Sequence, residues 1–383
     1  MTKEGVKHFD KRYLRSNKIN IWRVMLMKKP KPLAKGDKVA VVSLSSGMLG
    51  EDFVKHELDL GLKRIEEFGL IPVIMPNALK GIEYLKNHPE DRAQDLKEAF
   101  YDNSIKGIIC AIGGDDTYRT LPYLLEDKNF IDAVKNNPKL FTGFSDTTIN
   151  HLMFYKLGMG SFYGPNFVCD LAELDKEMLP YTKRSFLKYF EYHNEAPIES
   201  SDVWYEERTD FSAAAVGTSR VKHLEEKGYE VLQGKGKFNG RLLGGCLESL
   251  YNILTSTRHK DQKAICEKYG IFPTLNEWEN KILFLETSEE KPEPEKFEKE
   301  LLTLKNTGIF DVISGIIVGK PQDEQYYEEY KEIYRKIIEN KNLPIIYNVN
   351  FGHAQPRCII PYGIETEVDL DKKVITLKEA IFA

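Results

Sequence analysis

The chain has 383 residues, enough for two domains or one large one, and 42% apolar with 30% charged residues is an ordinary globular balance. Its formal net charge of -5 gives no global reason to expect a nucleic acid polymer or an anionic membrane as a partner. No run approaches the roughly 18 apolar residues of a membrane-spanning helix. The five cysteines are scattered without a C-x-x-C pair, so we expect no disulfide framework, no structural zinc and a cytoplasmic location.

Residues 1–35 differ from the rest of the chain because they carry eleven Lys or Arg against two Asp or Glu. A secretory signal needs an apolar core of about 7–15 residues and a small-residue cleavage site, and neither is clear here. We therefore interpret residues 1–35 as a basic N-terminal arm.

Short apolar runs alternate with helical patterns in residues 36–200. Strands are predicted at 39–43, 71–75 and 107–112 and from Leu140, and helices at 52–68 and 89–101. Such alternation is typical of a largely parallel sheet covered by helices. We expect this region to form an N-terminal α/β domain.

The rhythm changes at residues 201–240, a polar and then Gly-rich segment that we interpret as a connector with loops over the site. Residues 241–383 predict a second α/β domain, with strands at 282–285 and 312–318 and helices at 246–255, 294–305 and 325–340. The tail alternates at period two in 357–360, 365–370 and 374–377, which predicts antiparallel strands or a small barrel-like element.

The stretch Leu140-Phe-Thr-Gly-Phe-Ser145 has the outline of a nucleophile elbow, because a β-type run enters a Gly-X-Ser turn and a helical pattern follows. A serine needs a base and an orienting acid. Glu286 and His353 follow strand-like runs downstream and are candidates for these roles. Each of the three residues alone could be structural, but all stand at the carboxyl ends of predicted strands, where open α/β sheets bind ligands.

Other histidines are weaker candidates. His151 lies six residues after Ser145 on the following helix, facing away from where a base must be. His56-Glu57 lacks the second histidine of H-E-x-x-H, so the usual metalloprotease helix is absent.

Five motifs together carry a family resemblance: Gly113-Gly-Asp-Asp116, Gly143-Phe-Ser-Asp146, Leu243-Gly-Gly-Cys-Leu-Glu248, Phe284-Leu-Glu286 and Gly352-His-Ala-Gln-Pro356. In this order the chain resembles the serine LD-carboxypeptidases, which include the microcin C self-immunity peptidases, from about residue 35 to 377. The resemblance implies a flavodoxin-like N-terminal domain with the nucleophile and a C-terminal domain with the other two catalytic groups. It also implies a homodimer and a reaction without metal or organic cofactor.

Carried over by position, the resemblance makes Ser145 the nucleophile, Glu286 the orienting acid and His353 the general base. It further implies an oxyanion hole from the backbone N–H groups of Gly114 and Asp146. One departure is Cys246, which stands where the family pattern has Asn; it is either a harmless small residue or a change in the cleft wall.

Substrate residues are less defined. Asp115 and Arg119, in and just after the Gly-Gly-Asp-Asp turn, are candidates to bind substrate, with Arg119 gripping a terminal carboxylate as in cleavage of cell-wall L-to-D peptides. Trp204 resembles the tryptophan-bearing loop of the self-immunity branch, which cleaves an acyl bond to a modified nucleotide. Arg119 could equally be a surface arginine and Trp204 a local packing anchor. The connector and the length favour the self-immunity branch.

Two other classes of protein remain open. An α/β-hydrolase esterase shares the order Ser, acid, His, but it would want a second glycine where this chain has Thr147, and a His-Gly-Gly loop. A non-catalytic small-molecule binding protein would also suit two α/β lobes around a cleft.

Overall fold

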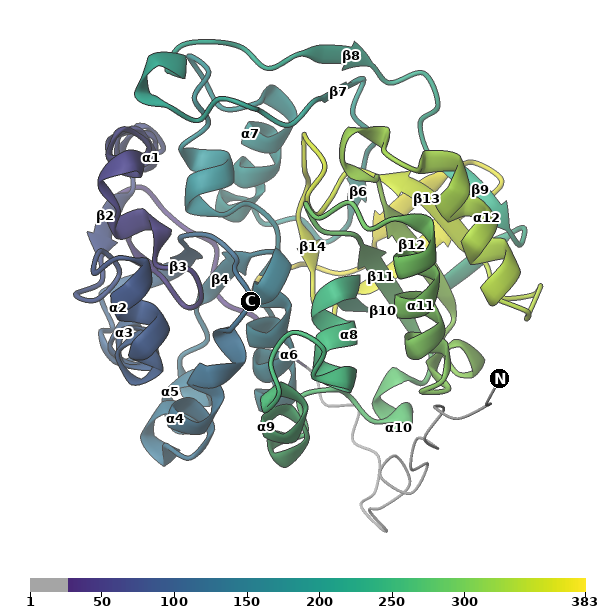
Figure 1. Cartoon of the computed structure of the whole chain (residues 1–383), viewed down its shortest axis with the longest axis horizontal. Helices are drawn as coiled ribbons and strands as arrows, with labels where there is room; N and C mark the ends of the chain where they lie inside the picture. Colours follow the sequence, from purple (N-terminus) through teal and green to yellow (C-terminus); the bar gives the residue numbers. More distant parts are fainter. Residues whose placement is uncertain (1–26) are drawn as a thin grey trace, which may run out of the picture.

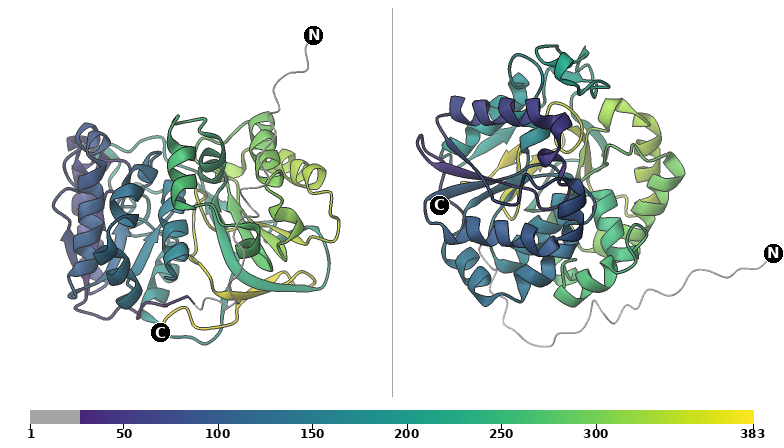
Figure 2. Two further views of the ribbon diagram at one scale, coloured as in Figure 1. Left: turned by 90° about the horizontal axis from the view of Figure 1, so that it is seen from below. Right: turned by 60° about the vertical axis from the view of Figure 1, so that its left-hand side comes forward.

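The computed structural model of the chain describes residues 27–383, so most of the predicted basic arm lies outside the described part. Two large sheets stand side by side, with helices α6 (Thr148–Leu157) and α8 (Leu247–Thr255) packed together between them (Figure 1; Figure 2, left). Within residues 27–383, no helix has both the length and the apolar character needed to cross a membrane.

The first sheet contains five parallel strands in the order β2-β1-β3-β4-β5, the flavodoxin-like order, with β14 added antiparallel to β5. This confirms the predicted α/β class. Its strands are β1 (Lys38–Val42), β2 (Ile71–Ile74), β3 (Ile105–Cys110), β4 (Leu140–Gly143), β5 (Phe162–Tyr163) and β14 (Ile360–Pro361).

Helices cover both faces of this sheet, which explains why its strands are mostly apolar. Val39 and Val41 of β1 belong to one buried cluster, whereas Ala40 and Val42 belong to another, so successive side chains enter cores on opposite faces. The helices are α1 (Lys55–Glu67), α2 (Ile82–Asn87), α3 (Pro89–Tyr101), α4 (Leu121–Leu125), α5 (Lys128–Asn136), α6 and α7 (Pro180–Leu187).

The second sheet is mixed and open, in the order β6-β16-β15-β10-β11-β12-β13-β9, with β10 to β13 parallel and the outer pairs antiparallel. Its strands are β6 (Ala196–Ile198), β9 (Glu230–Gln233), β10 (Lys237–Cys246), β11 (Lys281–Glu286), β12 (Gly315–Gly319), β13 (Ile345–Val349), β15 (Glu365–Asp369) and β16 (Val374–Leu377). The helices are α8, α9 (Gln262–Tyr269), α10 (Leu275–Trp278), α11 (Pro294–Lys305) and α12 (Tyr327–Ile337).

The two halves exchange short strands. β6 precedes the connector in sequence but lies at the edge of the second sheet, whereas β14 leaves the tail to pair with β5 of the first. Residues 201–240 are more regular than a loop: they contain the hairpin of β7 (Val203–Tyr205) and β8 (Lys222–Leu224), at the top of Figure 1, and then β9 and the start of β10.

Some predicted boundaries differ from those observed. The strand expected at 312–318 begins at Gly315, because Ile309–Asp311 forms a helical turn first. The helix expected at 325–340 begins only at Tyr327, because Tyr326 has a left-handed backbone with φ +55°.

Candidate active site

Ser145 stands directly after β4 in a sharp turn. Its φ is +68°, a left-handed backbone that is rare for a residue with a side chain and typical of a nucleophile elbow. Thr148 Oγ1 donates to its carbonyl at 2.7 Å, and the phenol of Tyr163 accepts its N–H at 3.0 Å. Gly113 allows the close approach of the neighbouring turn, because a Cβ there would lie 2.7 Å from Ser145 Cβ.

Glu286 and His353 meet at the carboxyl ends of two parallel strands of the second sheet. His353 Nδ1 lies 2.8 Å from Glu286 Oε2, and the backbone N–H of His353 donates to the same oxygen at 3.0 Å. Gly352 makes this possible, because with φ +81° a Cβ there would lie 2.3 Å from the carboxylate. The geometry is that of an acid that orients an imidazole.

Tyr163 connects the two sheets at the site and was not identified from the sequence. Its hydroxyl donates to Glu286 Oε1 while it accepts the N–H of Ser145, so one fully buried phenol links the acid to the serine backbone. The sequence gives no indication of this role, because a tyrosine in a short buried strand is usually a packing residue of the core.

The other ring nitrogen of His353 is also occupied. Its Nε2 lies 2.8 Å from a carboxylate oxygen of Glu289, and in residues 27–383 no hydrogen bond joins His353 to Ser145. Burial disfavours the imidazolium, but Glu286 and Glu289 outweigh this and raise the pKa of His353. Conversely, burial would raise the pKa of Glu289, but His353 outweighs it and lowers that pKa.

Ser145, His353 and Glu289 line one cavity of about 570 Å³, together with Gly113 and Gly114. Arg357 was missed from the sequence although it follows His353 by four residues. Its guanidinium lies 4.0 Å from the ring centroid of Phe144 and 3.2 Å from Asp170. Part of the cavity wall is apolar, formed by Phe53, Val54, Val168, Leu174 and Phe211. Arg208 and Arg220 also line the cavity, and both bind Glu173.

The predicted oxyanion residues are next to Ser145. Gly114 also lines the cavity, and its φ of +144° would place a Cβ 2.3 Å from Ser45 Oγ. The buried carboxylate of Asp146 accepts from Ser45 Oγ at 2.7 Å and from the N–H of Thr117 at 2.8 Å, and burial raises its pKa to about 6. These bonds lock the glycine turn to the elbow and hold both backbones in fixed orientation.

Two of the three predicted substrate residues lie around a neighbouring hollow. Arg119 lines a hollow of about 450 Å³ with Asp115, apart from the Ser145 cavity, and its guanidinium donates to the Lys86 carbonyl at 2.6 Å and to Asp116 at 3.4 Å. Asp115 also borders a narrow crevice beside Ser145.

Trp204 lies on β7, and its ring does not line the Ser145 cavity. It stacks on His223 with centroids 4.2 Å apart, and Lys320 Nζ lies 5.1 Å from the Trp204 ring centroid.

His151 is fully buried between Ser161 Oγ and the Gly143 carbonyl, and burial lowers its pKa to about 3. Cys246, Glu286 and His353 form one group in residues 27–383 whose potential ligand atoms lie within 4.8 Å of one another. Cys246 Sγ nevertheless donates to Glu248 Oε2 at 3.3 Å.

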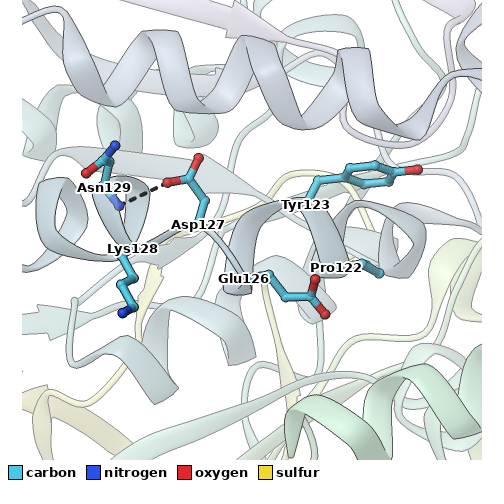
Figure 3. Close-up of a pocket in the computed structure, with 6 residues that line it drawn as sticks. All are labelled: Pro122, Tyr123, Glu126, Asp127, Lys128 and Asn129. Carbon is cyan, nitrogen blue, oxygen red and sulfur yellow. Dashed lines mark hydrogen bonds between the residues drawn. The ribbon is translucent and has the colours of Figure 1, made fainter.

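A hollow of about 580 Å³ on α4 and α5 has no comparable chemistry (Figure 3). Its acidic groups already serve structural roles: Asp127 caps α5 through the N–H of Asn129 and binds Lys97, and Glu126 binds Lys268. The cavity at Ser145 is therefore the candidate active site.

Comparisons with known proteins show the family of the chain. The LD-carboxypeptidase N-terminal domain matches residues 39–164, and the LD-carboxypeptidase C-terminal domain matches residues 239–368. An MccF-like protein from Streptococcus pneumoniae, solved in complex with AMP, is 54% identical with a TM-score of 0.86, covering 89% of this chain and 98% of that one.

More distant relatives carry two kinds of name. The microcin C7 self-immunity protein MccF of Escherichia coli is 27% identical, over 91% of this chain and 95% of its own. A structure of MccF in complex with aspartyl sulfamoyl adenosine is 25% identical with a TM-score of 0.76, over 93% and 99%. A probable murein peptide carboxypeptidase of Bacillus subtilis is 26% identical, over 92% and 95%.

Proposed function

The chain belongs to the LD-carboxypeptidase family, and we propose that Ser145, His353 and Glu286 are the nucleophile, general base and orienting acid of this serine-type hydrolase. The observation that carries the proposal is the Glu286–His353 hydrogen bond at 2.8 Å, formed at the wall of the cavity that Ser145 also lines. Ser145 comes from the first sheet and the acid–base pair from the second.

The proposed reaction begins when Glu289 leaves His353 and the Nε2 proton is lost to water, so that Nε2 can accept a hydrogen bond from the Ser145 hydroxyl. His353 then takes the serine proton as Ser145 Oγ attacks the carbonyl carbon, while Glu286 holds the Nδ1–H and stabilises the imidazolium. The tetrahedral oxyanion lies against the N–H groups of Gly114 and Asp146. His353 gives its proton to the leaving group, and water releases the acyl group from Ser145.

The placement of these groups also separates the proposal from the esterase alternative. In an α/β-hydrolase the serine stands above one sheet, with its partners on loops of the same sheet. Here the acid and base follow β11 and β13 of the second sheet, whereas Ser145 follows β4 of the first. A non-catalytic binding protein is the remaining alternative, and turnover distinguishes it.

We favour an acyl-nucleotide amide as substrate over a murein peptide. An MccF-like protein with 54% identity binds AMP, and a cavity of about 570 Å³ lies within the ordinary range for drug-sized ligands. On this proposal Arg119, Asp115 and Trp204 contact substrate only if it extends beyond the cavity. We further propose that the protein is cytoplasmic and that it forms a homodimer. Light scattering of the purified chain tests the oligomeric state.

The test is a paired hydrolysis assay by mass spectrometry, comparing wild type with Ser145→Ala. Serine-dependent release of Asp or Glu from a sulfamoyl adenosine conjugate supports the nucleotide substrate, and serine-dependent release of D-Ala from a muropeptide supports the cell-wall substrate instead. Circular dichroism confirms that the variant is folded. Turnover that survives in Ser145→Ala contradicts the nucleophile, and folded wild type that binds AMP without turnover favours the binding protein.

A further inference from the structure

Glu289 occupies the nitrogen of His353 that the reaction needs. A carboxylate only accepts hydrogen bonds, so a 2.8 Å contact to Nε2 requires a proton on that nitrogen. Nδ1 is held by Glu286 in the same way. The imidazole bound by both carboxylates is an imidazolium, which has no lone pair to accept the Ser145 proton.

The backbone next to Glu289 is held in place, whereas the Glu289 side chain is exposed to solvent. Its neighbour Ser288 is anchored, because the Ser288 N–H and Oγ both donate to the buried carboxylate of Glu248, at 2.9 and 2.7 Å. The Glu289 side chain itself is 65% exposed. A rotamer change can therefore remove the carboxylate from His353 without moving the backbone.

A carboxylate that leaves an imidazolium needs another cation, and the arginines around this cavity are engaged. Arg357 binds Asp170, whereas Arg208 and Arg220 bind Glu173. Arg258, across the crevice, binds Glu290. Among the described residues that line the cavity and the crevice, every arginine is paired and there is no lysine, so a cation brought by the substrate is the partner left for Glu289.

We propose that Glu289 determines specificity by exchanging its ion pair with His353 for one with a protonated amino group that the substrate carries beside its scissile carbonyl. This rests on the proposed function of Ser145 and His353. When the ammonium takes Glu289, the imidazolium retains one carboxylate and loses its Nε2 proton to water. Glu286 keeps the Nδ1–H, and the freed Nε2 can accept the Ser145 proton. Aminoacyl conjugates with a free α-amino group meet this requirement, and N-acylated ones do not.

The groups that face His353 set its protonation together. They are the carboxylates of Glu286 and Glu289, the thiol of Cys246, the ring of Phe144 at 4.9 Å between centroids and the Arg357 guanidinium, whose Nη2 lies 3.4 Å from the His353 carbonyl. Among these charged groups only Glu289 has a largely exposed side chain.

The test compares wild type, Glu289→Gln and the control Glu290→Gln. Glu290 has the same charge on the same loop but binds Arg258 and Lys296. An uncharged fluorophosphonate at pH 7 forms a Ser145 Oγ–P bond and expels fluoride only when His353 accepts the serine proton. We expect labelling to be about tenfold faster in Glu289→Gln, as expected for loss of one charge-assisted hydrogen bond, and unchanged in Glu290→Gln.

A second readout uses matched substrates with free and N-acetylated amino groups. Wild type should prefer the free amine in kcat/KM, and Glu289→Gln should lose about tenfold of that preference. Equal labelling of all three proteins, or an unchanged preference, overturns the role of Glu289 while leaving the nucleophile intact. Folded wild type that is never labelled at Ser145 overturns the catalytic assignment, and this inference with it.

Discussion

The two carboxylates that hold His353 share a charge and a distance of 2.8 Å but differ in their surroundings. Glu286 is 1% exposed, ends a central strand and receives further hydrogen bonds from Tyr163 and the His353 backbone. Glu289 is 65% exposed on a loop. A buried carboxylate with several donors is fixed, whereas an exposed carboxylate that contacts only one nitrogen of the ring is replaceable. The same residue type therefore has a permanent role on one side of the ring and a conditional role on the other.

The largest expected effect comes from Glu286→Gln. The neutral amide no longer stabilises the imidazolium or selects the required tautomer, and comparable changes in serine hydrolases lower kcat by about 10⁴-fold. Glu289→Gln makes the same chemical change on the other side of the ring and should not lower turnover of an N-acylated substrate, which has no ammonium for Glu289, at neutral pH. Steady-state kinetics of both variants test this contrast, and similar losses in both would abolish the distinction.

The second largest effect is expected in the pH dependence of activity, which should distinguish the roles of Glu286 and Glu289. Burial disfavours the imidazolium, but Glu286 and Glu289 raise the pKa of His353 to about 10, so kcat/KM should still rise with pH above pH 8. In the substrate complex Glu289 is paired with the substrate ammonium, so the acid limb of the kcat profile should lie at lower pH than that of the kcat/KM profile. Glu289→Gln should move the kcat/KM limb down by about one unit. Coincident limbs for kcat and kcat/KM in wild type would contradict the exchange.

The free energy of unfolding should also depend on pH, because folding shifts the pKa values of His353 and Glu289. Because folding raises the pKa of His353 from 6.5 to about 10, the stabilisation is fully present below pH 6.5 and lost as the pH rises through about 10. Glu289 has a lowered pKa, so its contribution is present above pH 4.5 and lost at lower pH. Urea unfolding between pH 5 and 10 measures the His353 contribution, and Glu289→Gln should flatten the alkaline decrease.

The sequence predicted the fold class and the positions of Ser145, Glu286 and His353 because these depend on local patterns. Apolar runs mark the strands, and turns after parallel strands place residues at one sheet edge. It did not predict that β14 joins the first sheet or that Tyr163 bridges Ser145 and Glu286, since both depend on contacts between distant segments. For the same reason no local pattern in the sequence places Glu289 beside His353.

Tyr163→Phe should have an intermediate effect, chiefly on stability. It removes the hydroxyl that donates to Glu286 Oε1 and accepts the Ser145 N–H, leaving two buried polar groups without this partner. Such losses cost about 1–3 kcal/mol each, and the retained ring avoids a cavity. Urea unfolding measures the free energy, and kcat should fall less than in Glu286→Gln. A variant as stable as wild type would show that water replaces the phenol.

Cys246→Ser should have the smallest effect and tests whether the buried side of the ring depends on a third group. Cys246 is paired with Glu286 in strand register, but its thiol donates to Glu248, and burial raises its pKa well above the ordinary value. A serine retains a donor of similar size, so kcat/KM should stay within about threefold and the free energy of unfolding within about 1 kcal/mol. A larger loss of kcat without loss of stability would mean that the residue at position 246 acts on Glu286 directly, and the fixed carboxylate would then depend on Cys246 as well as on Tyr163.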